Sequence, residues 1–84
     1  MKYRAVVDEE TSMDLGDAIL VDFFPEGSPD WDCFLTFNVR TRSWHGPTPM
    51  RPSLELPTKD ELLAAIPEAI IARCVAAAIT YVRA

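Results

Sequence analysis

The sequence predicts an α+β fold, in which an antiparallel sheet of three or four strands is packed on one face by C-terminal helix in the order β-β-β-(β)-α-α. Apolar and polar residues alternate along the first half, turn-forming residues separate these segments, and a helix-start signal precedes an alanine-rich apolar stretch. A chain of 84 residues holds one hydrophobic core. We therefore expect a single domain over 1–84, divided into a sheet (2–44), a proline-rich connection (45–57) and a helical part (58–84).

The first strand is expected at the start of the chain. Tyr3, Ala5 and Val7 alternate with polar residues, which is the period of a half-buried strand. The residues that follow, 9–16, are mostly polar and are expected to form a loop.

The second strand is expected over 17–24. Its odd-numbered positions are apolar and predict a buried face. Leu20 and Phe24 leave the opposite face less polar than an exposed sheet would need. The buried face is formed by Ile19, Val21 and Phe23.

Residues 25–30 are dense in turn formers and should reverse the chain into a third strand over 33–43. Leu35, Phe37 and Val39 are expected to point into the core. The opposite face, towards water or a partner, would present Thr36, Asn38, Arg40 and Arg42.

The segment 45–57 contains four prolines, which lack the amide donor that helices and central strands require. We interpret it as an extended connection that crosses the sheet. A short edge strand over 53–56 is the fourth strand of the alternative topology.

The helical part begins with a capping-box sequence. In this motif the Thr58 side chain accepts a hydrogen bond from the amide of residue 61, and the Glu61 side chain accepts one from the amide of Thr58. Pro67 disfavours helical conformation in the residue before it. We expect a short helix over 59–65, a kink, and a long helix with Pro67 at its first position.

The long helix is apolar around most of its circumference. Its alanine-rich side predicts that the helix is covered on both sides or that this side meets a second subunit, with Ala69, Ala72, Arg73 and Ala76 as the candidate dimer face. The alternative is that alanine serves helix propensity alone. The predicted core packs Tyr3, Val7, Ile19, Val21, Phe23, Leu35, Phe37 and Val39 against Leu62, Ile66, Ile70, Cys74, Val75 and Ile79.

The formal net charge is −5, and the acidic residues are concentrated in the first 32 positions, which hold nine carboxylates and two cations. This balance argues against direct binding of a nucleic-acid backbone and favours a basic protein partner or a role in solubility. The candidate partner-binding acidic surface is Asp8, Glu9, Glu10, Asp14 and Asp17.

A second candidate surface combines aromatic and arginine side chains, the types enriched at interface hot spots. Arg40, Arg42 and Trp44 would continue one row on the third strand. The alternative is that the tryptophans cap the edges of the core while the arginines pair with acids. The complete candidate set is Trp31, Arg40, Arg42, Trp44 and Arg51.

No catalytic, cofactor or metal site is predicted. His45 is the single histidine and has no nucleophile in a recognised spacing, with Ser43 and Ser53 interpreted as loop-flanking residues. Cys33 and Cys74 are interpreted as buried free thiols. The acidic cluster lacks the spacing of a calcium loop, and the three cysteine and histidine residues cannot close a zinc site.

These observations predict a cytoplasmic, non-enzymatic, protein-binding module, because the first residues lack the apolar core of a signal peptide and no stretch is apolar enough to span a membrane. Its most concrete form is a small acidic inhibitor that occludes a nucleic-acid-handling complex, as short acidic phage proteins do, anti-CRISPR proteins among them. That comparison rests on size, charge and lack of motifs. The alternative is an accessory or assembly subunit that uses the alanine-rich helix face, and homodimerisation is expected through the same face.

Overall fold

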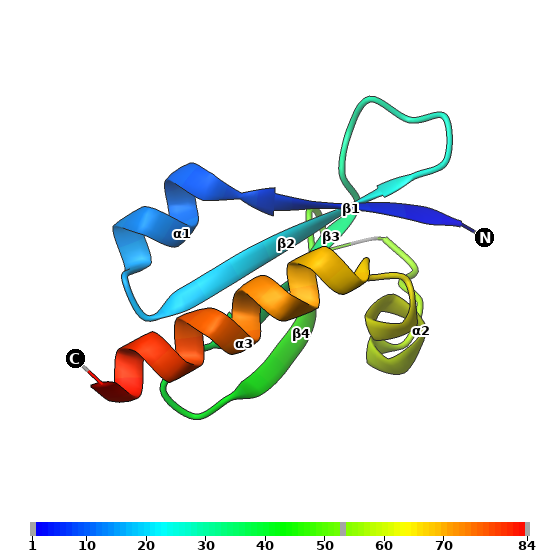
Figure 1. Ribbon diagram of the computed structural model, residues 1–84. Helices are drawn as coiled ribbons and strands as arrows, with labels where there is room; N and C mark the ends of the chain where they lie inside the picture. Colours follow the sequence, from blue (N-terminus) through cyan, green and yellow to red (C-terminus); the bar gives the residue numbers. More distant parts are fainter. Residues whose placement is uncertain (1, 53, 84) are drawn as a thin grey trace.

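The computed structural model describes residues 2–52 and 54–83, which form a four-stranded antiparallel sheet and three helices (Figure 1). The strands neighbour one another in chain order, as a meander. This confirms the predicted α+β class. The elements are β1 (Tyr3–Asp8), α1 (Glu9–Leu15), β2 (Ala18–Pro25), β3 (Cys33–Asn38), β4 (Ser43–Pro49), α2 (Lys59–Ala64) and α3 (Glu68–Arg83).

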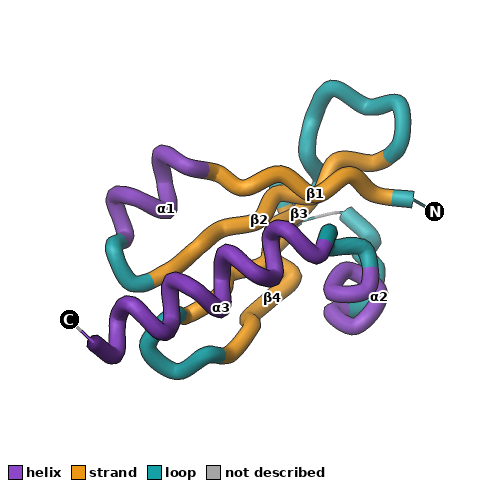
Figure 2. The backbone as a smooth tube through the Cα atoms, viewed as in Figure 1, coloured by secondary structure: helices purple, strands orange, loops and turns teal. Residues whose placement is uncertain are grey.

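The strand register divides the side chains of the sheet into two sets. Val21 lies opposite Val7 on β1 and Leu35 on β3, so these three belong to the same face. This face forms the core with α2 and α3, which therefore cover the same side of the sheet (Figures 1 and 2). The buried core residues are Ile19, Val21, Phe23, Cys33, Leu35, Phe37, Val39, Leu62, Ile66, Cys74 and Ala78.

The two C-terminal helices follow the predicted pattern. Thr58 Oγ1 accepts a hydrogen bond from the Glu61 amide at 3.2 Å, which is the N-cap half of the predicted capping box. The return bond from the Thr58 amide to the Glu61 side chain does not occur among the described residues. The helical conformation is interrupted between α2 and α3. The Pro67 carbonyl then accepts hydrogen bonds from the amides of Ile70 and Ile71 at the start of α3. The kink at Pro67 is confirmed.

The rotation of α3 differs from the prediction. Cys74 and Ala78 face the sheet, whereas Val75 and Ile79 are 52% and 42% exposed. Their predicted place in the core is wrong. Packing against the sheet places Cys74 and Ala78 on the buried side of α3, and the residues next to them in the chain, rotated by about 100° around the helix, therefore face outwards.

The predicted loop over 9–16 is a helix, α1. Asp8 Oδ1 accepts from the Thr11 amide at 3.1 Å, and Glu9 and Glu10 occupy the first turn, where carboxylates are favourable. Gly16 ends the helix with φ 76°, and its amide donates to the Ser12 carbonyl. Local capping therefore outweighs the polar composition.

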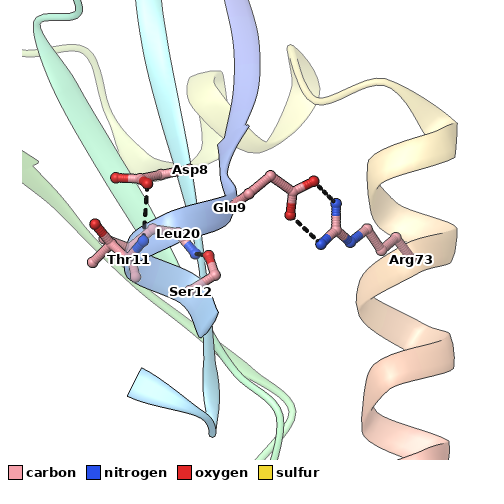
Figure 3. Close-up of polar contacts among 6 residues, drawn as sticks. All are labelled: Asp8, Glu9, Thr11, Ser12, Leu20 and Arg73. Carbon is pink, nitrogen blue, oxygen red and sulfur yellow. Dashed lines mark hydrogen bonds and ion pairs between the residues drawn. The ribbon is translucent and has the colours of Figure 1, made fainter. Parts of the chain in front are cut away.

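Ser12 attaches α1 to the sheet. β1 ends at Asp8, opposite Leu20 on β2. The buried Ser12 hydroxyl then accepts from the Leu20 amide at 2.9 Å (Figure 3). A side chain thus satisfies a strand amide at the point where the neighbouring strand stops.

The third strand is shorter than predicted. Asn38 Oδ1 accepts from the amides of Arg40 and Thr41 at 2.9 and 3.0 Å, which forms a turn. Arg42 follows with φ 59°, and its amide donates to the Asn38 carbonyl at 2.8 Å. The extension of this strand to residue 43, with Arg40 and Arg42 on its outer face, is therefore wrong.

The fourth strand lies at 43–49 and takes up the first five residues of the segment 45–57 that was predicted as a connection. Residues 54–56 form no strand, and Ser53 lies outside the described residues. The prolines are accommodated because β4 is an edge strand. Gly46, with φ 120°, lies at a bulge where an added Cβ would be 3.0 Å from the Phe34 carbonyl oxygen.

Substitution of neighbouring phenylalanines on opposite faces tests this register. Phe37→Ala should lower the free energy of unfolding by about 3–5 kcal/mol because Phe37 is buried in the core. Phe34→Ala, on the other face and half-buried, should cost less than about 2 kcal/mol. Chemical denaturation measures both, and equal losses would contradict the assignment of faces.

Removal of the Ser12 hydroxyl tests the link between α1 and β2. Ser12→Ala should lower the free energy of unfolding by about 1–3 kcal/mol, because the Leu20 amide is left without an acceptor. Hydrogen exchange at the Leu20 amide should also accelerate. Ser43→Ala, at an exposed hydrogen bond, is the control. Unchanged stability and unchanged Leu20 protection would refute the role of Ser12.

Candidate binding surfaces

The second face of the sheet carries apolar side chains that do not belong to the core. Within the described residues, α2 and α3 contribute to the core on the opposite face. Leu20 is 7% exposed and lies outside the core cluster, and Val6 is 37% exposed. Phe24 and Phe34 are half-buried. We call this the open face, formed by Val6, Leu20, Asp22, Phe24 and Phe34.

Asp22 lies at the centre of the open face. Val6 on β1 and Phe34 on β3 are its partners across the sheet. Leu20 and Phe24, two positions before and after it on β2, are its neighbours along the strand. A carboxylate is thus surrounded on four sides by apolar side chains.

This environment raises the pKa of Asp22 above the ordinary value for an aspartate. Burial is the larger cause, because the charged form loses hydration, and repulsion from Asp8 adds to it. Arg4, on the same strand as Asp8, places its guanidinium carbon 4.7 Å from the centre of the Phe24 ring. The only ion pair found in the described part of the chain joins Glu9 and Arg73, so Arg4 does not neutralise Asp22.

Trp31 extends the open face at its β3 side. Its ring meets Phe34 edge-on, with centroids 5.9 Å apart and an interplanar angle of 72°. The open face therefore presents an aromatic pair beside the carboxylate.

The predicted acidic surface is partly occupied by contacts within the chain. Asp8 caps α1, and the Glu9 carboxylate pairs with both terminal nitrogens of Arg73 on α3 (Figure 3). The Arg73 hydrogen bond lowers the pKa of Glu9. Glu10, Asp14 and Asp17 are exposed, and α1 places Glu10 and Asp14 four residues apart on one side of the helix.

A groove of about 490 Å³ separates α1 from α3 beneath the Glu9–Arg73 pair. Ile19, Val39 and Ala77 contribute apolar lining. Met13, 80% exposed, and Tyr81 flank it. Pattern reasoning missed this groove, because it depends on the helical state of 9–15.

The predicted aromatic and arginine surface is not a single surface. Trp44 lies on β4 opposite Phe37 and contacts that ring on the core face, with centroids 5.0 Å apart. Trp31 lies on the open face. Arg40 and Arg42 occupy the turn before β4, and Arg51 follows β4. The row from Arg40 to Trp44 is wrong because the chain reverses between them.

The outer side of α3 is exposed and apolar. Ala69, Ala72 and Ala76 lie in solvent, with Arg73 drawn to Glu9. The exposed Val75 and Ile79 join them, beside a hollow of about 220 Å³ that Phe37 and Arg42 also line. Homodimerisation through this side stays a prediction.

Hydrogen bonding brings together one pair of potentially reactive side chains. The Ser43 hydroxyl lies 3.0 Å from His45 Nε2 and 2.7 Å from the Thr41 hydroxyl, all exposed. No described carboxylate hydrogen-bonds to the imidazole, so the third member of a triad is not provided. Burial raises the pKa of the free Cys33 thiol to about 11, which disfavours the nucleophilic thiolate.

No protein-family model matches the chain, and neither a curated protein nor a solved structure matches it. In the described part of the chain, no three potential metal-ligating side chains are grouped together, and no helix has the length and apolar character needed to cross a membrane.

Neutralising Asp22 should stabilise the fold at neutral pH. Because the folded-state pKa is raised, ionisation of Asp22 opposes folding once the pH exceeds the ordinary carboxyl pKa, and this penalty is absent at lower pH. Asp22→Asn should therefore raise the melting temperature at pH 7, with the gain disappearing towards about pH 3. Arg4 and Asp8 are the charged groups nearest in the β1 register.

Asp30→Asn, at an exposed loop position, is the matched control and should leave the melting temperature close to that of the wild type at both pH values. A destabilised Asp22→Asn protein at pH 7 would refute the unfavourable environment assigned to Asp22.

Proposed function

We propose that this chain is a non-enzymatic protein-binding module that holds another protein against the open face of its sheet. The observation that carries the proposal is the position of Val6, Phe24 and Phe34 on the face of the sheet opposite the one that α2 and α3 cover. Large apolar groups gathered on an uncovered surface are characteristic of interaction sites. A protein partner would remove this apolar area from water.

The acidic charge supports a partner with a basic surface. Glu10, Asp14 and Asp17 are exposed at the end of the sheet where β1 gives way to α1. Such charges accelerate encounter with a cationic protein. The most concrete form of the proposal is an inhibitor that occludes the basic surface of a nucleic-acid-handling complex. Two free, buried cysteines fit a reducing compartment, so we place this activity in the cytoplasm.

An accessory or assembly subunit is the second candidate. The exposure of Val75 and Ile79 beside Ala72 and Ala76 favours it, because these residues form an apolar stripe along α3. The two candidates use different faces of the molecule and are separable by mutation.

Affinity capture with paired variants tests the two candidates. Val6→Glu places a charge on the open face, and Ala72→Glu places the same charge on α3; both positions are exposed. A cooperative melt of each variant is confirmed first, because the new carboxylate in Val6→Glu lies opposite Asp22. The proposal predicts that a partner captured from source cells by the wild type is lost with Val6→Glu and retained with Ala72→Glu. Quantitative mass spectrometry gives the readout. Loss with Ala72→Glu alone would favour the assembly subunit and contradict the open-face site.

Charge reversal tests the inhibitory form in the same assay. Asp14→Lys and Asp17→Lys should weaken capture, and duplex DNA or RNA should compete with the chain for its partner. A captured partner that is insensitive to nucleic acid would contradict occlusion of a nucleic-acid site.

A further inference from the structure

The open face contains a charge with no counter-charge from its own chain. Asp22 is half-buried among Val6, Leu20, Phe24 and Phe34. In the described residues, the one ion pair does not involve its carboxylate, and the carboxylate oxygens keep contact with water. Arg4, on the neighbouring strand, instead stacks on Phe24. A carboxylate in such a ring costs stability in the free protein.

Resting on the proposed function, we infer that the open face recognises an arginine of the partner protein, whose guanidinium pairs with Asp22 while apolar side chains beside it cover Val6, Phe24 and Phe34. The surrounding apolar contacts exclude water from the ion pair, which is the arrangement found at interface hot spots. Asp8, on the same face, contributes a second negative charge.

The aromatic neighbours favour arginine over lysine. A guanidinium is planar, stacks on aromatic rings and binds a carboxylate through two parallel hydrogen bonds, whereas an ammonium is more strongly hydrated. The chain already provides an example on this face, because the Arg4 guanidinium carbon lies 4.7 Å from the Phe24 ring centre. Phe34, beside Asp22 on β3, is a second ring on this face.

Two other occupants are excluded, a nucleic acid by charge and a divalent cation by the lack of oxygen ligands. Asp22 and Asp8 repel the phosphates of a nucleic acid, although aromatic side chains on a sheet suit stacked bases. A divalent cation such as Ca²⁺ requires six or more oxygen ligands, and the four neighbours of Asp22 in the sheet provide apolar side chains.

The spacing along β2 suits an extended partner segment. Leu20, Asp22 and Phe24 lie two residues apart, which corresponds to roughly 7 Å between side chains on one face of a strand. A partner strand with apolar residues two positions before and after its arginine has the same spacing.

Synthetic peptides provide the test. Short extended peptides with Val, Leu or Phe two positions on each side of a central residue are prepared in four series, in which that residue is arginine, lysine, citrulline or glutamate. Fluorescence anisotropy measures their affinity for the full chain. The protein variants are wild type, Asp22→Asn, Asp22→Lys and the control Asp30→Asn, each checked for a cooperative melt.

The wild type should bind the arginine series most tightly, ahead of lysine, with citrulline and glutamate at least about tenfold weaker. Asp22→Asn should remove the preference for arginine over citrulline, and Asp22→Lys should reverse it in favour of glutamate. Asp30→Asn should bind as the wild type does. If Asp22→Lys does not fold, the Asp22→Asn result decides.

The outcomes separate this inference from the function on which it rests. Equal binding of arginine and citrulline peptides, lost on Phe34→Ser but not on Asp22→Asn, would overturn the arginine assignment and leave the open face as a protein-binding site. Failure of the wild type to bind any series would overturn both. Preferential binding of single-stranded oligonucleotides over all peptides would also overturn both.

Discussion

The burial of one face of the meander against Leu62, Cys74 and Ala78 is the interaction on which the rest of the structure depends. A domain of 84 residues has material for one such core. Because side chains alternate along a strand, packing α2 and α3 on that face leaves every second strand residue on the opposite face of the sheet. The open face is therefore a direct consequence of where the helices lie, and its composition reflects demands other than the core.

The open face combines two features that a solvent-exposed sheet does not need. Val6, Phe24 and Phe34 place apolar area in partial contact with water, and Asp22 places a charge among them. Both features lower the stability of the free protein. The apolar side chains remain partly in contact with water, and the Asp22 carboxylate loses part of its hydration. Residues that serve binding often lower the stability of the free protein. A partner that covers the apolar area and supplies a cation to Asp22 would remove both unfavourable contributions.

The acidic end of the molecule is organised by local hydrogen bonds. Asp8 caps α1, Ser12 ties that helix to the Leu20 amide, and Glu9 reaches Arg73 on α3 (Figure 3). Because Glu9 and Arg73 are both exposed, their pairing contributes little to stability. Its consequence is the position of α1, which lies beside a groove and presents Glu10 and Asp14 on one side of a helix. They can attract a basic partner towards the neighbouring open face.

The sequence alone determined the features that depend on near neighbours in the chain. Alternation along β1, β2 and β3, the Thr58 cap and the break at Pro67 all follow from periods of two or from contacts within four residues. The sequence also showed, through Leu20 and Phe24, that the second face was unusually apolar.

Tertiary structure decided the rest. The roll of α3 was ambiguous because apolar residues occupy most of its circumference, so packing against the sheet selected Ala78 over Val75 and Ile79. The ring around Asp22 joins three strands, and the pairing of Glu9 with Arg73 joins residues 64 positions apart. Such contacts depend on register and on the placement of whole elements, which no local pattern encodes.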